Sequence, residues 1–167
     1  AVISITEVEK GSTWFKVKFD CNDPDIFYYG DVMLPDIYEQ YCGSNPDNIP
    51  AYVTSYLTAL KEENDEFNAM SMAQFISYIT VNGESEYDTA LTDVANSLLP
   101  EMEYPVFAIG IANDGSFTTE PVVKMVRTGE TERNNWILDD KKVTDIQYDV
   151  TVYPAYDEVY AAILERD

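Results

Sequence analysis

The chain has 167 residues and a formal net charge of −21, which comes from 31 acidic residues, 10 basic residues and no histidine. Without histidine, it has no Ser-His-Asp triad, no Cys-His dyad, no His-ligated zinc and no imidazole acid–base catalyst. Its hydrophobic content of 46% and aromatic content of 13% argue against a disordered chain. We therefore expect a single globular domain over residues 1–167.

The first 48 residues predict a β-hairpin followed by an irregular segment. Residues 2–9 and 13–19 alternate in polarity around a Gly-Ser turn, as the two strands of a hairpin do. Residues 20–48 are expected to lack regular structure, because three turns that contain proline interrupt them. These turns are Asp23-Pro24-Asp25, Leu34-Pro35-Asp36 and Asn45-Pro46-Asp47.

Residues 49–100 predict an acidic helical insert. Pro50 suits a first helical position, because its missing N–H has no partner there in any case. From Val53 to Leu60, apolar residues then recur at helical spacing. The first helix of the insert is therefore expected to begin at this proline.

Two later positions in the insert have the spacing of a helix-capping box. Ser71 is followed three residues later by Gln74, and Ser85 is followed three residues later by Asp88. An apolar run follows each pair, and Pro100 closes the second run. We expect one helix after each box.

The rest of the chain predicts strands and one helix. Strands are expected at residues 106–112 and 122–128, on either side of an Asn113-Asp114-Gly115 turn. The apolar stripe within residues 156–164 predicts an amphipathic helix packed on the sheet. The order of elements indicates an α+β fold. In this fold the N- and C-terminal strands form a mostly antiparallel sheet, to which the helical insert and the C-terminal helix are added. Further strands are expected at residues 136–138 and 143–153.

The negative charge is concentrated in the middle of the chain. From Phe19 to Glu120 there are 19 acidic residues and one basic residue, Lys61. A field of this sign repels nucleic-acid phosphates and anionic lipid head groups. The sequence therefore predicts no direct nucleic-acid partner and no membrane partner. It favours a protein partner with a basic surface, or self-association.

Eight acidic residues of the insert form the predicted partner-binding face. Acids at the C-terminal end of a helix oppose its dipole, so the cluster that follows Lys61 indicates a functional need for negative charge. The eight residues are Glu62, Glu63, Asp65, Glu66, Glu84, Glu86, Asp88 and Asp93.

Aromatic residues cluster in the segment expected to be irregular. Tyrosine in loops is typical of protein–protein contact, because it combines a large rigid ring with a polar tip. The alternative is that these rings cover the core from a loop, and the sequence leaves both interpretations open. The residues are Phe27, Tyr28, Tyr29, Tyr38 and Tyr41.

The sequence predicts no cofactor and no metal site, although it leaves a weak calcium site near residues 20–25 as an alternative. Residues 20–25 begin like an EF-hand loop, but Pro24 takes the fifth position and Asp31 stands where the twelfth position has glutamate. Cys21 and Cys42 are expected to be buried thiols, with a disulfide as the alternative.

The leading functional hypothesis is a non-enzymatic protein that acts through protein–protein contact. Its expected setting is an accessory or structural subunit of a larger assembly, such as a phage particle or a filament. The first alternative is a DNA-mimic inhibitor of a nucleic-acid-binding enzyme, and the second is a carboxylate-based hydrolase or a Ca²⁺-binding protein. No targeting signal and no apolar run of membrane-spanning length is found in the sequence, which favours the host cytoplasm or a virion.

Overall fold

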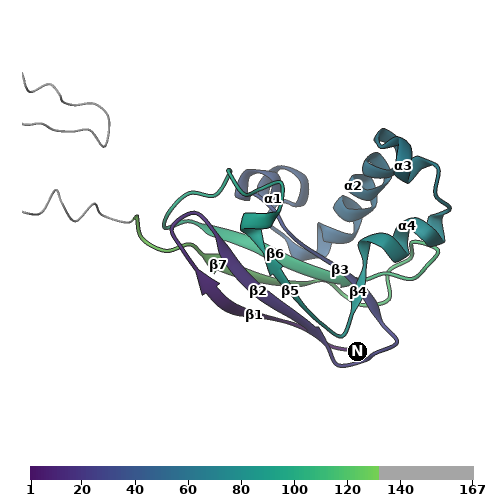
Figure 1. Ribbon diagram of the computed structural model, residues 1–167, viewed down its shortest axis with the longest axis horizontal. Coiled ribbons are helices and arrows are strands. Elements are labelled where there is room, and N and C mark those ends of the chain that lie inside the picture. Colours follow the sequence, from purple (N-terminus) through teal and green to yellow (C-terminus); the bar gives the residue numbers. More distant parts are fainter. Residues whose placement is uncertain (132–167) are drawn as a thin grey trace, which may run out of the picture. The chain divides into compact units, whose positions relative to one another are not determined.

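Two antiparallel sheets and four α-helices make up residues 1–131, the part of the chain that the computed structural model describes (Figure 1). The α+β fold predicted from the sequence is confirmed. In chain order the elements are β1 (Ile3–Lys10), β2 (Phe15–Cys21), β3 (Phe27–Val32), α1 (Pro35–Cys42), the 3₁₀ turn η1 (Pro46–Asn48), α2 (Ile49–Glu63), α3 (Asp65–Asn68), α4 (Met72–Ile79), β4 (Val81–Asn82), β5 (Glu84–Asp88), the 3₁₀ turn η2 (Thr89–Leu91), β6 (Glu103–Gly110) and β7 (Val122–Arg127).

The predicted N-terminal hairpin is confirmed and forms most of the first sheet. β1 pairs antiparallel with β2, and β5 adds to the other edge of β2, which gives sheet 1 the order β1-β2-β5. Alternate residues of β2, namely Phe15, Val17 and Phe19, are buried. Lys16 and Lys18 lie between them and point to the opposite face of the sheet.

One stretch of chain, residues 81–88, belongs to both sheets. β4 pairs with β3 in sheet 2, whose order is β4-β3-β6-β7, and after Gly83 the chain continues as β5 in sheet 1. Gly83 has a φ of +66°, a left-handed conformation that glycine adopts without steric cost. At the far side of the two sheets, the N–H of Gly129 donates to the carbonyl of Gly11 at 2.8 Å.

Sheet 2 is the middle of three layers, because its strands bury both faces. One face packs on sheet 1, and the other packs on helices α1, α2 and α4. This explains why β6 is a nearly continuous apolar run rather than an alternating one. The first core includes Phe15, Phe19, Tyr28, Tyr104 and Val126, and the second includes Cys42, Val53, Phe75, Phe107 and Ile109.

Residues 20–48 contain regular structure, so the prediction of an irregular segment is wrong. β3 and α1 both lie in this stretch, and α1 begins at Pro35, in the first turn, where proline is tolerated. Of the three proline turns, only the first lies between elements, because Pro35 begins α1 and Pro46 begins η1. In that first turn the carboxylate of Asp23 accepts the N–H of Asp25 at 3.0 Å, just before β3 begins.

The helix predicted after Ser85 is also wrong, because residues 84–88 form β5. In this strand Ser85 and Tyr87 are partly buried, while Glu84 and Glu86 are exposed. Such alternation with a period of two is the pattern of a strand with one face on the core. It outweighs the capping-box spacing of Ser85 and Asp88.

The helical insert is consequently shorter than expected. Its last helix ends at Ile79, not near residue 100, and the apolar residues that follow Leu91 lie in turns and in irregular chain. Asp88 does cap a short helical turn, because its carboxylate accepts the N–H of Ala90 at 2.9 Å.

The two helices predicted earlier in the insert are confirmed. α2 contains Pro50 in its first turn, and α4 begins with a complete capping box. The Ser71 hydroxyl accepts the N–H of Gln74 at 3.1 Å, and the Gln74 side chain accepts the N–H of Ser71 at 2.9 Å. None of the helices in residues 1–131 has the length and apolar composition of a membrane span.

The predicted pair of strands around Asn113-Asp114-Gly115 is confirmed as β6 and β7, which pair antiparallel. Gly115 in the connecting segment has a φ of +90°. The expected strands at 136–138 and 143–153 and the expected helix at 156–164 lie outside the described residues.

Candidate functional site

Asp31 is an acidic residue in an otherwise largely apolar strand. Along β3, Tyr28 and Val32 are buried against sheet 1, and Tyr29 and Asp31 alternate with them. Tyr29 packs on the core beneath the helices, and Asp31 therefore lies on the same, helix-covered side of sheet 2. Its side chain is only partly exposed.

Three donors converge on the Asp31 carboxylate. The Tyr29 hydroxyl donates to Oδ2 at 2.6 Å, and the Tyr87 hydroxyl donates to Oδ1 at 2.7 Å. The N–H of Val32 also donates to Oδ1, at 2.8 Å. Because Tyr87 comes from β5, this carboxylate connects sheet 2 with sheet 1.

The site is negatively charged and has no cation within ion-pair distance among the described residues. Burial raises the pKa of Asp31, the three hydrogen bonds oppose this shift, and the charge of Asp93 adds to it. Burial also raises the pKa of Tyr87, and the charge of Asp31 raises it further. The ion pairs found in residues 1–131 all lie on sheet 1 and include neither acid.

A row of tyrosines leads from the surface to this carboxylate. Tyr41 of α1 lies 6.1 Å from Tyr52 of α2 between ring centroids, and Tyr52 lies 6.0 Å from Tyr56 with an interplanar angle of 13°. Burial raises the pKa of Tyr56, and the charges of Asp31 and Asp93 raise it next, which places its hydroxyl in the field of both acids. Tyr41 itself is 59% exposed.

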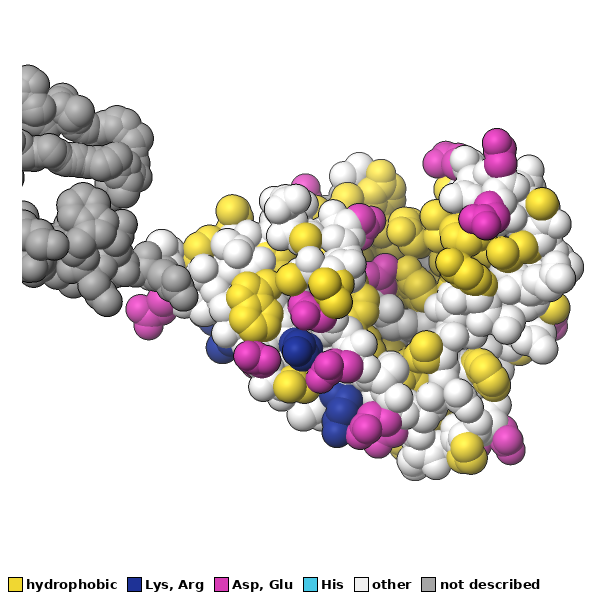
Figure 2. All heavy atoms as spheres, viewed as in Figure 1, with side chains coloured by type: hydrophobic (Ala, Val, Ile, Leu, Met, Phe, Trp, Pro, Cys, Tyr) yellow, Lys and Arg dark blue, Asp and Glu magenta, His cyan; other side chains and the backbone are white. Residues whose placement is uncertain are grey.

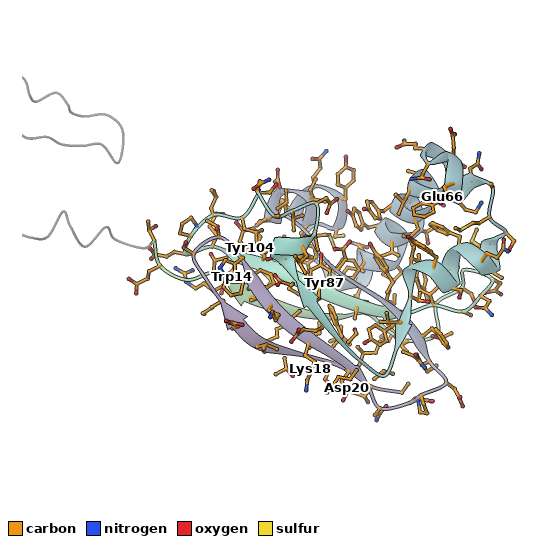
Figure 3. All side chains as sticks on the ribbon, viewed as in Figure 1. Trp14, Lys18, Asp20, Glu66, Tyr87 and Tyr104 are labelled. Carbon is orange, nitrogen blue, oxygen red and sulfur yellow. The ribbon has the colours of Figure 1, made fainter. Side chains whose placement is uncertain are left out.

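The protein surface is hollowed near this group. Figure 2 shows a concavity between the helices α2–α4 and the segment that follows β5, with hydrophobic and acidic side chains at its base. Tyr87 lies centrally, between β5 and the helices (Figure 3). The edge of β3 is open here, because β4 pairs only with Phe27 and Tyr28. We call the group of Asp31, Tyr29, Tyr56, Tyr87 and Asp93 the Asp31 site.

The eight acids predicted to form one face lie in separate parts of the structure. Glu84 and Glu86 are on β5, where Lys18 pairs with Glu84 at 2.7 Å and Lys16 approaches Glu86 at 3.9 Å. These two glutamates are therefore balanced by lysines of β2. Asp88 caps η2, and Asp93 belongs to the Asp31 site.

The remaining four acids, Glu62, Glu63, Asp65 and Glu66, surround the junction between α2 and α3, and we call them the α2–α3 corner. Figure 3 shows Glu66 at the end of the helices that is far from the sheets. The Asn64 side chain accepts the N–H groups of Glu66 and Phe67, so Asp65 and Glu66 begin a new helix. The negative charges of Asp65 and Glu66 interact favourably with the dipole of α3, contrary to the sequence-based expectation. Only Glu62 and Glu63 lie at a helix end where acids are unfavourable.

The five predicted aromatic residues also separate. Tyr28 is fully buried, and its hydroxyl donates to the carbonyl of Gly83 at 2.8 Å. Tyr38 of α1 is buried, and Phe27 is 44% exposed at the start of β3. Tyr29 belongs to the Asp31 site, and Tyr41 belongs to the row of tyrosines that leads to it. Tyr28 and Tyr38 thus belong to the core, whereas protein–protein contact by the exposed rings stays a prediction.

Cys21 and Cys42 are free, buried thiols, as expected. Cys21 belongs to the core between the sheets, and Cys42 belongs to the core beneath the helices. Around Asp20 and Asp25, as in the rest of residues 1–131, no three His, Cys, Asp or Glu side chains come together as a metal ion would require.

A second concave site lies between α2, α4 and the β6–β7 connection, with a volume of about 460 Å³. Its floor is apolar and includes Leu57, Phe75 and Phe117, and its charged lining residues, Lys61, Glu62 and Asp114, carry both signs. No buried charge lies there. The Asp31 site is the stronger candidate, because perturbed titratable groups concentrate at functional sites.

Sequence reasoning did not select Tyr56 or Tyr87, and it named Asp31 only as the twelfth position of the EF-hand-like stretch. The available signal was a single acid inside the run from Ile26 to Leu34, which is otherwise apolar or aromatic apart from a glycine. Comparison with protein families, with curated proteins and with solved structures finds no match to this chain. The functional argument therefore depends on the geometry and charge of the site.

Proposed function

We propose that this protein is a non-enzymatic binding protein that holds a protein partner with a basic surface, as an accessory or structural subunit of a larger assembly. The observation that supports this proposal is an uneven balance of charge. Residues 1–131 contain 22 acidic and six basic residues. Lys10, Lys16 and Lys18 all lie within 4.0 Å of glutamates on sheet 1, so four of the six acids on its strands have a lysine partner.

Several acids without an ion-pair partner in residues 1–131 lie on the helix side of the molecule. They include the α2–α3 corner and the Asp31 site, and the tyrosine row from Tyr41 to Tyr56 lies beside the latter. Acidic groups that flank exposed tyrosine rings suit a partner with basic side chains, because charge steers the encounter and aromatic area supplies contact. Identical subunits can also meet this need, since Lys124 and Arg127 lie on β7.

The test compares two variants that remove the same amount of charge from different places. One replaces the α2–α3 corner by Gln or Asn (E62Q, E63Q, D65N, E66Q). The matched control neutralises four glutamates of sheet 1 (E7Q, E9Q, E84Q, E86Q). A partner captured from the organism that encodes the chain is identified and purified, and its affinity is measured at low and high salt. Light scattering of the chain alone reports self-association.

We expect the corner variant to lose affinity mainly through a slower association rate, and the sheet 1 variant to retain more of it. Equal losses of affinity in both variants would mean that the net charge of the chain, and not the α2–α3 corner, determines binding. A chain that stays monomeric and binds no protein at low salt would contradict the proposal.

The second candidate function is a DNA-mimic inhibitor, which the α2–α3 corner favours because its four acids lie close together in sequence on one junction. Such an inhibitor should compete with duplex DNA for a basic enzyme, and salt should weaken the competition steeply. Unchanged inhibition by the corner variant would exclude this surface as the mimic.

A further inference from the structure

The Asp31 site combines a negative charge with aromatic faces. Asp31 and Asp93 act on the same tyrosine hydroxyls, as the raised pKa values of Tyr56 and Tyr87 indicate. No ion pair in residues 1–131 neutralises either acid. A cation that enters the site would therefore meet charge that nothing in the described part of the chain balances.

The rings supply the second element of cation recognition. A cation over the face of a tyrosine is attracted by the ring quadrupole, and the effect is about 0.5–2 kcal/mol, depending on how far the cation is desolvated. Tyr29, Tyr56 and Tyr87 are each partly exposed, as is Asp31, so the site is accessible from the surface. Tyr52 stacks on Tyr56 and holds its ring in place.

The hydrogen bonds of Asp31 limit which cation fits. Each carboxylate oxygen has two lone pairs, and Oδ1 already accepts from Tyr87 and from the Val32 amide. Oδ2 accepts only from Tyr29 and has one lone pair left. The two-pronged contact of a guanidinium with both oxygens is therefore blocked, whereas a lysine ammonium needs only one acceptor and can direct its other N–H groups elsewhere.

We propose that the Asp31 site binds a lysine side chain of the protein partner, with the ammonium on Asp31 Oδ2 and between the tyrosine rings. This inference rests on the proposed function, because it names the group of the partner that the acidic surface receives. Its chemistry is that of a charged hydrogen bond combined with cation–π contact.

The experiment uses the full chain with isotope-labelled tyrosine rings and three small probes. The probes are the N-acetyl methylamides of lysine, of arginine and of ε-acetyl-lysine, which is neutral. Ring resonances are assigned from single Tyr→Phe variants and followed by NMR titration. We expect the lysine probe to shift the resonances of Tyr29, Tyr56 and Tyr87, the arginine probe to bind more weakly, and the neutral probe to leave them unchanged.

Variants then locate the contact. Asp31→Asn should weaken the lysine probe at least about tenfold, which corresponds to about 1.4 kcal/mol. The matched control, Asp25→Asn, removes one charge from an exposed position away from the site and should have no effect on binding. Tyr56→Phe keeps the ring face and should retain binding, whereas Tyr56→Leu should lose it.

Three results would overturn the inference: equal shifts with the neutral probe, tighter binding of arginine than of lysine, or unchanged affinity in Asp31→Asn. If Asp31→Asn does not fold, the comparison of Tyr56→Phe with Tyr56→Leu still tests the inference. The probes need no partner, so the two proposals can fail separately. If the lysine probe does not bind but the corner variant still loses affinity for the partner, only the Asp31 site is refuted. Probe binding without any protein partner would instead refute the proposed function.

Discussion

At the scale of single residues, Asp31 is a carboxylate in a position where its charge is costly. Tyr29, Tyr87 and the Val32 amide donate to it, but burial outweighs them and its pKa is raised. A group whose pKa is higher in the folded than in the unfolded state stabilises the fold below its unfolded pKa, and this contribution is lost as the pH rises through the folded pKa. Asp31 therefore makes the protein relatively less stable at pH 7 than at mildly acidic pH.

We predict that Asp31→Asn flattens this pH dependence, because asparagine carries no charge that burial can penalise. Urea unfolding at about pH 5 and about pH 7 should show a smaller loss of stability in the variant than in the original chain. Asp25→Asn, at an exposed position, serves as the control. Parallel losses in the original chain and in Asp31→Asn would mean that this carboxyl does not control the slope.

Gly30 of β3 is a position where a neighbouring ring leaves no room for a side chain. A Cβ atom placed on Gly30 would lie 2.8 Å from Cζ of Phe19, whose ring is buried. Gly30→Ala should therefore destabilise the protein by about 1–3 kcal/mol, the typical cost of overpacking a core. Denaturant melts of the single variants and of Gly30→Ala with Phe19→Leu give the check. If the two losses are simply additive, the predicted clash is absent.

At the scale of elements, the sequence predicted the hairpin of β1 and β2, the pair β6 and β7, and helices α2 and α4. Their signals are local: alternation, a glycine turn, a proline at a helix start and one complete capping box. β5 was missed because Ser85 and Asp88 have the spacing of a cap, while the partners that favour a strand, Lys16 and Lys18, lie far away in sequence.

The candidate site was missed for a similar reason. Tyr29 and Asp31 are close in sequence, but Tyr87 arrives from another sheet, and Tyr56 arrives from a helix. No spacing rule connects these segments. The tyrosine interpretation did select Tyr29 and Tyr41, which lie in or near the candidate site, but it treated β3 and α1 as a loop.

We predict that the capping box of α4 contributes about 1 kcal/mol to stability. Ser71→Ala removes the acceptor for the Gln74 N–H at a helix start, and should lower the free energy of unfolding by about this amount. Ser55→Ala is the matched control, since Ser55 is exposed within α2, and alanine there should be neutral or slightly stabilising. Equal effects of the two substitutions would contradict a specific capping role.

At the scale of the whole molecule, a net charge of −21 makes the compact state repel itself. The four ion pairs of sheet 1 offset little of this repulsion, because surface pairs are typically worth 0 to about 1 kcal/mol. Salt screens the repulsion over a Debye length of about 10 Å at about 0.1 M.

We therefore predict a melting temperature that rises with added salt at pH 7, and that rises as the pH falls from 7 to about 5. Melting curves at both pH values, each with and without salt, test the prediction. A midpoint that falls on acidification and does not respond to salt would instead indicate acids that are individually paired or that bind a cation.

The strand that changes sheets at Gly83 has a consequence for how the protein unfolds. β4 contributes to one sheet and β5 to the other, so neither sheet can separate without breaking the continuous stretch 81–88 that the other needs. The two sheets of residues 1–131 are thereby coupled, and they should lose their slow-exchanging amide protons together. The eight residues 81–88 therefore make the unfolding of the two sheets cooperative, which stacking alone would not ensure.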